Sequence, residues 1–270
     1  LITTRRAGQS RVAIIDGRKV FRKEYPSFLE RGKCLELEFK MFEHFKYSMP
    51  STSYINHHIS PEARAEKEER TIQKWTKAGI NAPRIISREG SAILFEFMEG
   101  QSIDDLLTTP ELQTGHFDGF LDSFHEIRAR AKKSNDLDML HSDPHAGNFF
   151  YDAEKCQIIP LDPGIVPKGG MPFQELDDRL NLFALLKLFH LRTGDKNIAG
   201  YLNQAVGRLN SDEKERIFKL NRFPLTAWTY FNIHNISTKL LKQFNHGANR
   251  LSVYYSLKTV RQVGEALRQY

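Results

Sequence analysis

Cysteines are scarce in this chain and long apolar segments are missing. These shortages argue against a disulfide-rich protein, a zinc ribbon and a membrane-spanning protein. Its 270 residues include only two cysteines, Cys34 and Cys156. They lie far apart and outside any CxxC spacing, so we expect neither a disulfide framework nor a zinc ribbon. No apolar run approaches the roughly 20 residues that a membrane-spanning helix needs. The opening LITTRRAG matches neither an apolar signal core nor an amphipathic presequence, and we expect a cytoplasmic protein.

Internal repeats and low-complexity segments are absent as well. With 40% hydrophobic and 27% charged residues, the chain is expected to fold around a substantial core. Its net charge of +6 favours an anionic partner, such as a nucleotide, a phosphorylated glycan, a membrane surface or RNA. Much of the excess lies between Lys239 and Tyr270, where six Lys or Arg face one acid, Glu265. This run is either a solvated helix face or a surface for an anionic partner.

Strand patterns dominate the first part of the chain. Asp16-Gly17 lies between two β-prone runs and predicts a hairpin with strands at 11–15 and 18–24. Residues 61–78 are rich in Glu, Lys and Arg without an interior Pro or Gly, which predicts a helix that ends at Gly79. A second pair of strands is expected about Glu89-Gly90, with its second strand over 92–98. Residues 26–60 fit no single pattern.

Helical patterns dominate the rest. An amphipathic helix is predicted by apolar residues at three- and four-residue spacing: Phe117, Phe120, Leu121, Phe124 and Ile127. NFFYD and QIIPLD predict two short strands around a turn at 153–155. Beyond Pro172 the pattern is helical almost to the end, with a capping-box start at Asn210 and Glu213. We therefore predict an α+β protein with a strand-rich lobe at residues 1–98 and a helical lobe at 99–270.

The segment from His141 to Gly164, HSDPHAGNFFYDAEKCQIIPLDPG, carries the most informative chemistry. Asp143 and Asn148 lie five residues apart on a loop, and Asp162 follows the predicted hairpin. Phosphoryl transfer needs a carboxylate near the acceptor hydroxyl, and an amide oxygen with a second carboxylate to hold Mg²⁺. Mg²⁺ prefers such oxygen ligands and keeps some of its waters. The spacing matches H-x-D-x-x-x-x-N followed by D-x-G.

These motifs resemble those of the protein-kinase-like superfamily. HSDPHAGN is most similar to the loop of its non-standard bacterial branches: the lipopolysaccharide-core sugar kinases, Bud32-like atypical kinases, aminoglycoside phosphotransferases and ubiquinone-biosynthesis kinase-like proteins. The resemblance implies a two-lobed protein-kinase-like fold with ATP and Mg²⁺ as cofactors. It also implies that Asp143 receives the proton of the acceptor hydroxyl and that Asn148 and Asp162 hold the metal.

Three upstream segments extend the resemblance. VFRKEY resembles the nucleotide-binding Lys strand of these families, which points to Lys23. KEERTIQKWTKAGINAP is similar to the helix whose Glu pairs with that Lys, which points to Glu68. AILFEFMEG resembles the strand that leads into the interlobe hinge, so the backbone around Glu96 to Met98 is expected to meet adenine.

Departures from the protein-kinase pattern bear on the acceptor. Pro163 replaces the Phe whose packing sets active and inactive states, and no A-P-E follows Gly164. A predicted helix begins within about a dozen residues, which argues for a small or glycolipid acceptor over a protein. Arg6-Ala7-Gly8-Gln9 lacks the Lys of the Lys-x-Gly-Gln signature of the ubiquinone-type proteins, which disfavours that branch.

Each assignment has a plainer alternative. HSDPHAGN contains several turn formers, so the alternative interpretation of this segment is an ordinary Asp-Pro turn without a catalytic role. His141, Asp143 and His145 are also open to being the metal ligands of a hydrolase, H-x-D-x-H. The alternative for Lys23 is a solvated surface residue, one of a group of cations with Arg18, Lys19 and Arg22. Two other glutamates of the same predicted helix, Glu66 and Glu69, compete with Glu68 for the role of its partner.

The expectation from the sequence is an ATP- and Mg²⁺-dependent phosphotransferase acting on a hydroxyl of a lipopolysaccharide-core sugar. The alternatives are a Bud32-like serine/threonine protein kinase and a nucleotide-binding pseudokinase scaffold. The expected partners are ATP and a phosphorylated glycolipid or another small hydroxyl acceptor, with peripheral contact at the anionic inner face of the membrane. No nucleic acid partner is expected.

Overall fold

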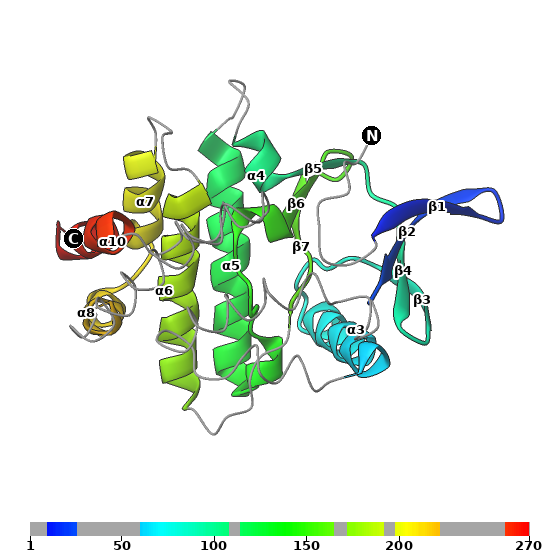
Figure 1. The fold of residues 1–270 in the computed structure, drawn as a ribbon, viewed down its shortest axis with the longest axis horizontal. Coiled ribbons are helices and arrows are strands. Elements are labelled where there is room, and N and C mark those ends of the chain that lie inside the picture. The colour runs from blue at the N-terminus through cyan, green and yellow to red at the C-terminus, as the bar shows by residue number, and fades with distance from the viewer. Residues whose placement is uncertain are drawn as a thin grey trace, which may run out of the picture. The chain divides into compact units, whose positions relative to one another are not determined.

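A computed structural model describes residues 10–25, 60–107, 114–164, 172–191, 198–221 and 257–269. These residues fall into two compact units, one up to residue 164 and one from residue 172. Among the described residues, all strands lie in the first unit and the second is helical (Figure 1). The first unit also contains every residue of the predicted site, so the site can be built within one unit.

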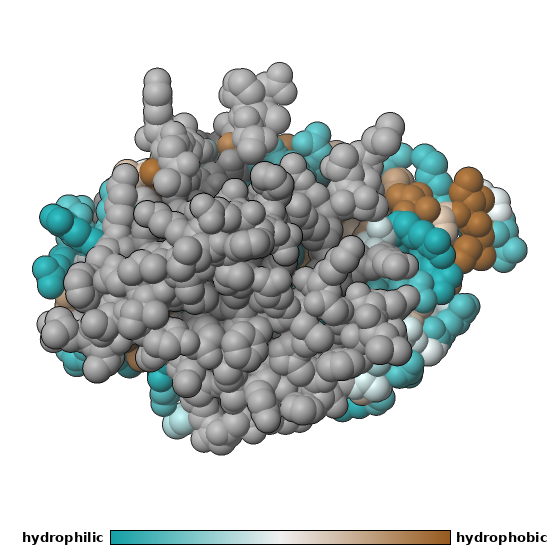
Figure 2. Space-filling view, viewed as in Figure 1, coloured by the Kyte–Doolittle hydropathy of each residue, from teal (hydrophilic) through white to brown (hydrophobic). Residues whose placement is uncertain are grey.

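A four-stranded antiparallel sheet opens the first unit, with the order β1-β2-β4-β3. Its tight turn at Asp16-Gly17 has φ of 49° and 74°, the left-handed pair that a primed hairpin turn requires. In β1, Val12, Ile14 and Ile15 are exposed, and Figure 2 shows hydrophobic surface over this hairpin. The strands span Arg11–Ile15 (β1), Arg18–Glu24 (β2), Ile85–Glu89 (β3) and Ala92–Glu96 (β4).

Helix α3 (Pro61–Lys77) packs against β3 and β4. Ser60 caps its N-terminus, because the Ser60 hydroxyl accepts a hydrogen bond from Ala63 N at 3.2 Å, and Pro61 occupies a position that needs no N–H donor. Its buried residues recur at three- and four-residue spacing: Ala65, Glu68, Thr71, Ile72 and Trp75. Gly79 follows with φ of 80°, so the chain leaves the helix there.

The remainder of this unit consists of a three-stranded antiparallel sheet with helices beside it. The sheet order is β5-β6-β7, and the apolar stripe of α5 packs on β7. At Gly100 a Cβ atom would come within 1.9 Å of the Tyr151 carbonyl oxygen, so only glycine allows this approach. The elements span Gly100–Ser102 (β5), Ile103–Leu106 (α4), Thr114–Ser134 (α5), Leu137–Met139 (η1), Ala146–Asn148 (η2), Phe149–Asp152 (β6) and Gln157–Pro160 (β7).

The second unit contains α6 (Phe173–Leu191), α7 (Ile198–Gly207), α8 (Ser211–Leu220) and α10 (Leu257–Gln269). Buried Asp178 of α6 accepts from Arg216 Nε of α8 at 2.7 Å. Both hydrogen bonds of the capping box between Asn210 and Glu213 are present at 3.0 Å. Within the described residues, no helix combines the length and the hydropathy needed to cross a membrane.

The predicted α+β class and the two-lobed kinase-like fold are confirmed. The strands predicted at 11–15 and 18–24 have those bounds. The strand predicted to reach Met98 ends instead at Glu96. Residues 26–59 and the segment around Gly8 lie outside the described residues, and the lobe boundary at residue 98 stays a prediction.

Candidate active site

One ion cluster joins three segments of the first unit. Lys23 Nζ of β2 lies 2.6 Å from Glu68 Oε2 of α3 and 3.0 Å from Asp162 Oδ1, which follows β7. Lys23 and Glu68 are 8% and 3% exposed, so the pair is withdrawn from water. The other two candidate glutamates are engaged elsewhere, Glu66 with Arg70 and Glu69 with Arg88.

This cluster has two carboxylates for one ammonium group, and the pKa values reflect that imbalance. Burial opposes the charged form of Lys23, but Asp162 and Glu68 outweigh it and raise its pKa to about 12. Burial raises the pKa of Glu68 to about 7, although Lys23 opposes that shift. Glu68 takes up a proton near neutrality while Lys23 stays charged, and Lys23 loses its proton only when both carboxylates are ionised.

Asp162 carries the more accessible of the two carboxylates. Burial works against its ionisation, but its side chain is 52% exposed and the charge of Lys23 lowers its pKa below the ordinary value. Its φ of 47° is left-handed, which is uncommon for a residue other than glycine and is often found at functional sites. Because the Asp162 carboxylate is ionised and exposed, it is able to bind a metal ion while it also pairs with Lys23.

The D-x-G segment is locked to the loop that carries Asp143. Ser142 N donates to Pro163 O at 2.8 Å, and Leu161 N donates to Asn148 O at 2.7 Å. Gly164 has φ of 66°, and a Cβ atom there would lie 2.0 Å from Ser142 Oγ. Glycine is therefore required at this position both by the backbone and by the neighbouring side chain.

Hydrogen bonds within the loop fix Asn148 and Asp143. Asn148 Nδ2 donates to Asp143 O at 2.9 Å, which leaves Asn148 Oδ1 as the amide atom suited to a cation. His145 Nδ1 accepts from Gly147 N at 3.1 Å, so the neutral ring carries its proton on Nε2. That nitrogen lies 3.4 Å from Asp143 Oδ2 and orients the carboxylate.

His141 forms the buried base of the loop. Its Nδ1 accepts from Asp143 N at 3.3 Å, which puts the ring proton on Nε2, and Nε2 donates to Leu161 O at 2.9 Å. Burial lowers the pKa of His141 to about 4, with Asp143 and Asp162 opposing. The ring is therefore neutral at pH 7 and both of its nitrogens are used.

These bonds disfavour the H-x-D-x-H metal site considered from the sequence. A zinc ligand would need a ring nitrogen of His141 or His145 with a free lone pair. In each ring one nitrogen already accepts from a backbone N–H, and the other carries the proton. Within the described parts of the chain, no group of three or more His, Cys, Asp or Glu residues is arranged to hold a metal ion.

The donor set suits Mg²⁺ better. Asn148 and Asp162 lie at the open end of the β6–β7 hairpin, where Phe149 pairs with Pro160 and Asn148 O accepts from Leu161 N. They supply one amide oxygen and one ionised carboxylate, and the cluster behind them carries an excess negative charge. Hard oxygen ligands, few in number and beside a negative charge, match the preference of Mg²⁺.

The predicted adenine-contacting backbone begins where β4 ends. Glu96 pairs with Val20 of β2, and Glu96 N donates to Arg84 O at 2.9 Å. Phe97 and Met98 follow outside any strand, as a connecting segment requires. The structure thus brings Lys23, Glu68 and Asp162 into one cluster, to which backbone hydrogen bonds join the Asp143 loop. Glu96 is the last residue of β4, the strand that pairs with the Lys23 strand β2, and Met98 follows it by two residues.

Sequence reasoning gave no role to Ser142 and read His145 only as an alternative metal ligand. Ser142 holds the D-x-G segment through its backbone, and His145 orients Asp143. The small residue before Asp143 and the His two residues after it were visible signals. Their effect depends on the loop closing on itself, which spacing alone does not show.

The two-lobed kinase-like fold and the family match support an assignment to the protein-kinase-like superfamily. Residues 56–188, just under half of the chain, match the family described as ABC1 atypical kinase-like domain. The matched segment includes Glu68, Asp143, Asn148 and Asp162, and it begins after Lys23. Comparison of the sequence with curated proteins gave no match.

Among solved structures, the chain is similar to "The complex structure of Rv3197-erythromycin from Mycobacterium tuberculosis". The two sequences are 17% identical, the TM-score is 0.39, and the alignment covers 99% of this chain and 72% of that chain.

Proposed function

We propose that this chain is an ATP- and Mg²⁺-dependent phosphotransferase that acts on a hydroxyl group. The observation that carries the proposal is the cluster formed by the buried Lys23–Glu68 pair and the exposed carboxylate of Asp162. It is built from three segments and is hydrogen-bonded through the backbone to the Asp143 loop. Such a cluster supplies a cation for phosphate oxygens and a carboxylate for a metal, beside a candidate base.

Each proposed role is supported by the contacts described above or by the sequence resemblance. Lys23, held by Glu68, binds phosphate oxygens of the nucleotide. Asn148 Oδ1 and Asp162 hold Mg²⁺, which when bound offsets the negative charge of the phosphates. Asp143 receives the proton of the acceptor hydroxyl, and His145 keeps its carboxylate oriented. The backbone of Glu96 to Met98 meets the adenine ring.

The competing proposal within the same superfamily is a pseudokinase scaffold that binds a nucleotide without turnover. The retention of all three polar groups, Asp143, Asn148 and Asp162, favours turnover, because a scaffold has no need of the base. A scaffold would show Mg²⁺-dependent stabilisation by ATP with no ADP formed.

For the acceptor we retain a small or glycolipid hydroxyl, with a lipopolysaccharide-core sugar as the specific candidate. Its support is the Pro163 replacement and the start of α6 at Phe173, soon after Gly164 in the sequence. The late basic residues give it less support than expected, because Arg261 pairs with Glu265 at 2.8 Å and Arg268 lies over the Phe218 ring at 4.8 Å.

The test compares the wild type with Asp143→Asn, using ADP release and phosphate transfer from ATP with Mg²⁺. Delipidated lipopolysaccharide-core oligosaccharide and a generic protein substrate serve as acceptors in separate arms. We expect the variant to lose ~10²- to 10⁴-fold in rate while ATP still raises its melting temperature. Asp212→Asn, at an exposed position on α8, is the matched control and should leave the rate unchanged.

Three results would count against the proposal in different ways. Retention of more than about a tenth of the rate in Asp143→Asn would remove the role of this residue. Absence of ADP formation with every acceptor, combined with ATP binding, would favour the scaffold. Efficient transfer to the protein substrate alone would exclude the glycan as acceptor.

A further inference from the structure

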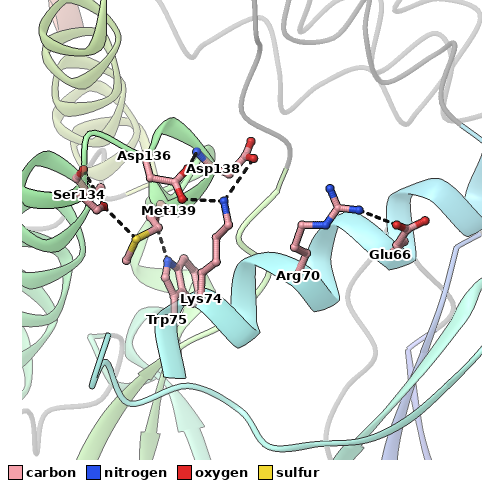
Figure 3. A network of polar contacts seen from close by, with 9 residues as sticks. Glu66, Arg70, Lys74, Trp75, Ser134, Asp136, Asp138 and Met139 are labelled. Atoms are coloured by element: carbon pink, nitrogen blue, oxygen red, sulfur yellow. Dashed lines mark hydrogen bonds and ion pairs between the residues drawn. The ribbon is translucent and has the colours of Figure 1, made fainter. Parts of the chain in front are cut away.

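The C-terminal turn of α3 is joined to the segment that leads into the catalytic loop. Trp75 is fully buried, and its indole Nε1 donates to Met139 O at 2.7 Å. Met139 ends η1 and lies two residues before His141. Figure 3 shows Trp75 and Lys74 on α3 pointing toward the η1 segment. A buried indole N–H needs an acceptor, and the one it has is the backbone of this segment.

Lys74 makes a second connection beside the first. Its Nζ lies 2.6 Å from Asp136 Oδ2 and 3.4 Å from Asp138 Oδ2 (Figure 3). The other oxygen of Asp136 accepts from Asp138 N at 3.0 Å and caps η1. One carboxylate therefore caps η1 and binds α3, so that a shift of either element would strain both interactions.

Ring contacts continue from Trp75 into the loop. The Trp75 and His141 rings lie 5.6 Å apart, and His141 is stacked on Phe149 at 5.3 Å. His141 Nδ1 in turn accepts from Asp143 N. The position of Trp75 is thus transmitted by packing and one hydrogen bond to the backbone of Asp143.

The other end of α3 carries Glu68. Glu68 and Trp75 are seven residues apart, which places them two turns apart on the same buried face. Glu68 holds Lys23, while Trp75 and Lys74 hold η1. A single helix therefore connects Lys23, through Glu68, to the loop of the candidate base.

We propose that Lys74 and Trp75 are positioning residues that keep α3 in register with the catalytic loop, and this rests on the proposed function of the site. Lys23 pairs with Asp162 as well as with Glu68, and a buried ion pair gives only weak support for a fixed geometry, so the Lys23–Glu68 pair alone does not secure the position of the helix. The two connections at η1 fix that position from the other end. Displacements of about 1 Å at a catalytic group cost as much as ~10²-fold in rate.

The experiment uses three substitutions of the full chain. Lys74→Met removes the charge and keeps much of the stem, and Trp75→Phe removes the indole N–H and keeps a ring. Arg70→Met is the matched control, because Arg70 lies one turn earlier and pairs at 2.5 Å with exposed Glu66 of the same helix. Lys74→Arg is the conservative variant that should restore the wild-type behaviour.

The decisive readout is hydrogen exchange of the backbone amides in residues 142–148, measured without nucleotide. These amides donate to His141, Asp143, His145 and Pro163. We expect faster exchange across the loop in Lys74→Met and Trp75→Phe, wild-type exchange in Arg70→Met, and recovery in Lys74→Arg. In parallel, turnover should fall about 10-fold while the Kd of ATP with Mg²⁺ changes by less than about twofold.

Unchanged protection of residues 142–148 in both variants would overturn the inference, and so would a loss of melting temperature without any change in loop exchange or turnover. Failure of the proposed function is seen separately. If the wild type transfers no phosphate but its loop protection still depends on Lys74 and Trp75, the proposed enzymatic activity is refuted. The positioning role of Lys74 and Trp75 is then still supported.

Discussion

The excess negative charge at the Lys23 cluster makes the substitution Glu68→Gln unusually informative. Replacing the carboxylate by an amide of the same shape leaves Asp162 as the counter-ion of Lys23, 3.0 Å away. The ammonium group is then still paired, so the large penalty for an unpaired buried charge does not arise. What changes is the cost of ionising a second, buried carboxylate close to that of Asp162.

The magnitude follows from the pKa of Glu68, which burial raises from 4.5 to about 7. A carboxyl with a higher pKa in the folded chain binds its proton more tightly there, so the free energy of unfolding falls as the pH rises from about 4.5 to about 7. At 1.36 kcal/mol for each pKa unit, the fall is up to roughly 3 kcal/mol. The Glu68→Gln variant lacks this titration. Its free energy of unfolding, relative to that of the wild type, should therefore rise by up to roughly 3 kcal/mol between pH 4.5 and pH 7.

The assay is urea unfolding of both proteins at pH 5, 6, 7 and 8, at one ionic strength and without nucleotide or Mg²⁺. His141, whose pKa burial lowers to about 4, titrates in the same range, but it does so in both proteins and cancels in the difference. Glu66→Gln is the control, because exposed Glu66 pairs with Arg70 at the surface and its difference from the wild type should not change with pH.

A difference between Glu68→Gln and the wild type that stays constant from pH 5 to pH 8 would refute this reasoning. It would mean that Glu68 ionises at its ordinary pKa and that the cluster accommodates both carboxylates without strain. Phosphate transfer by the variant should fall in either case, because Lys23 is then held from one side only.

Two further substitutions test the metal site and its backbone. Asp162→Ala should abolish the rise in melting temperature that ATP gives only with Mg²⁺; equal shifts with Mg²⁺ and with EDTA in the wild type and the variant would contradict the assignment. Gly164→Ala should lose about 1 kcal/mol from its left-handed φ of 66° and more from contact with Ser142 Oγ, with slower turnover. Ser142→Ala added to it should recover part of the rate, and no recovery would show that the contact is harmless.

Local sequence determined the hairpin turn, the helix caps and the spacing of the site motif. Asp16-Gly17 and the Asn210 capping box were predictable because each needs only residues within three or four positions of one another. The loop motif was recognisable for a similar reason, since Asp143 and Asn148 lie on one loop and Asp162 follows a short hairpin. The two-residue error at the end of β4 is an ordinary one, because pairing with β2 and β3 decides where a strand stops.

The resemblance to known kinase-like sequences pointed to Glu68, but the sequence left Glu66 and Glu69 of the same helix as alternatives. Glu68 lies on the same face as Ala65, Ile72 and Trp75, which are buried in the structure. The spacing could not show what this face packs against, and so could not pair Glu68 with a residue 45 positions away.

Only the tertiary structure decided the remaining contacts, because they join residues that are far apart in sequence and similar in type to their neighbours. Lys74 is of the same type as Lys67 and Lys77 of the same helix, so its sequence neighbourhood does not reveal that it reaches Asp136 and Asp138, 62 and 64 residues away. The tautomers of His141 and His145 depend on backbone groups that approach only when the loop closes. Burial is likewise a property of the folded chain, and it is burial that raises the pKa of Glu68 and keeps His141 neutral.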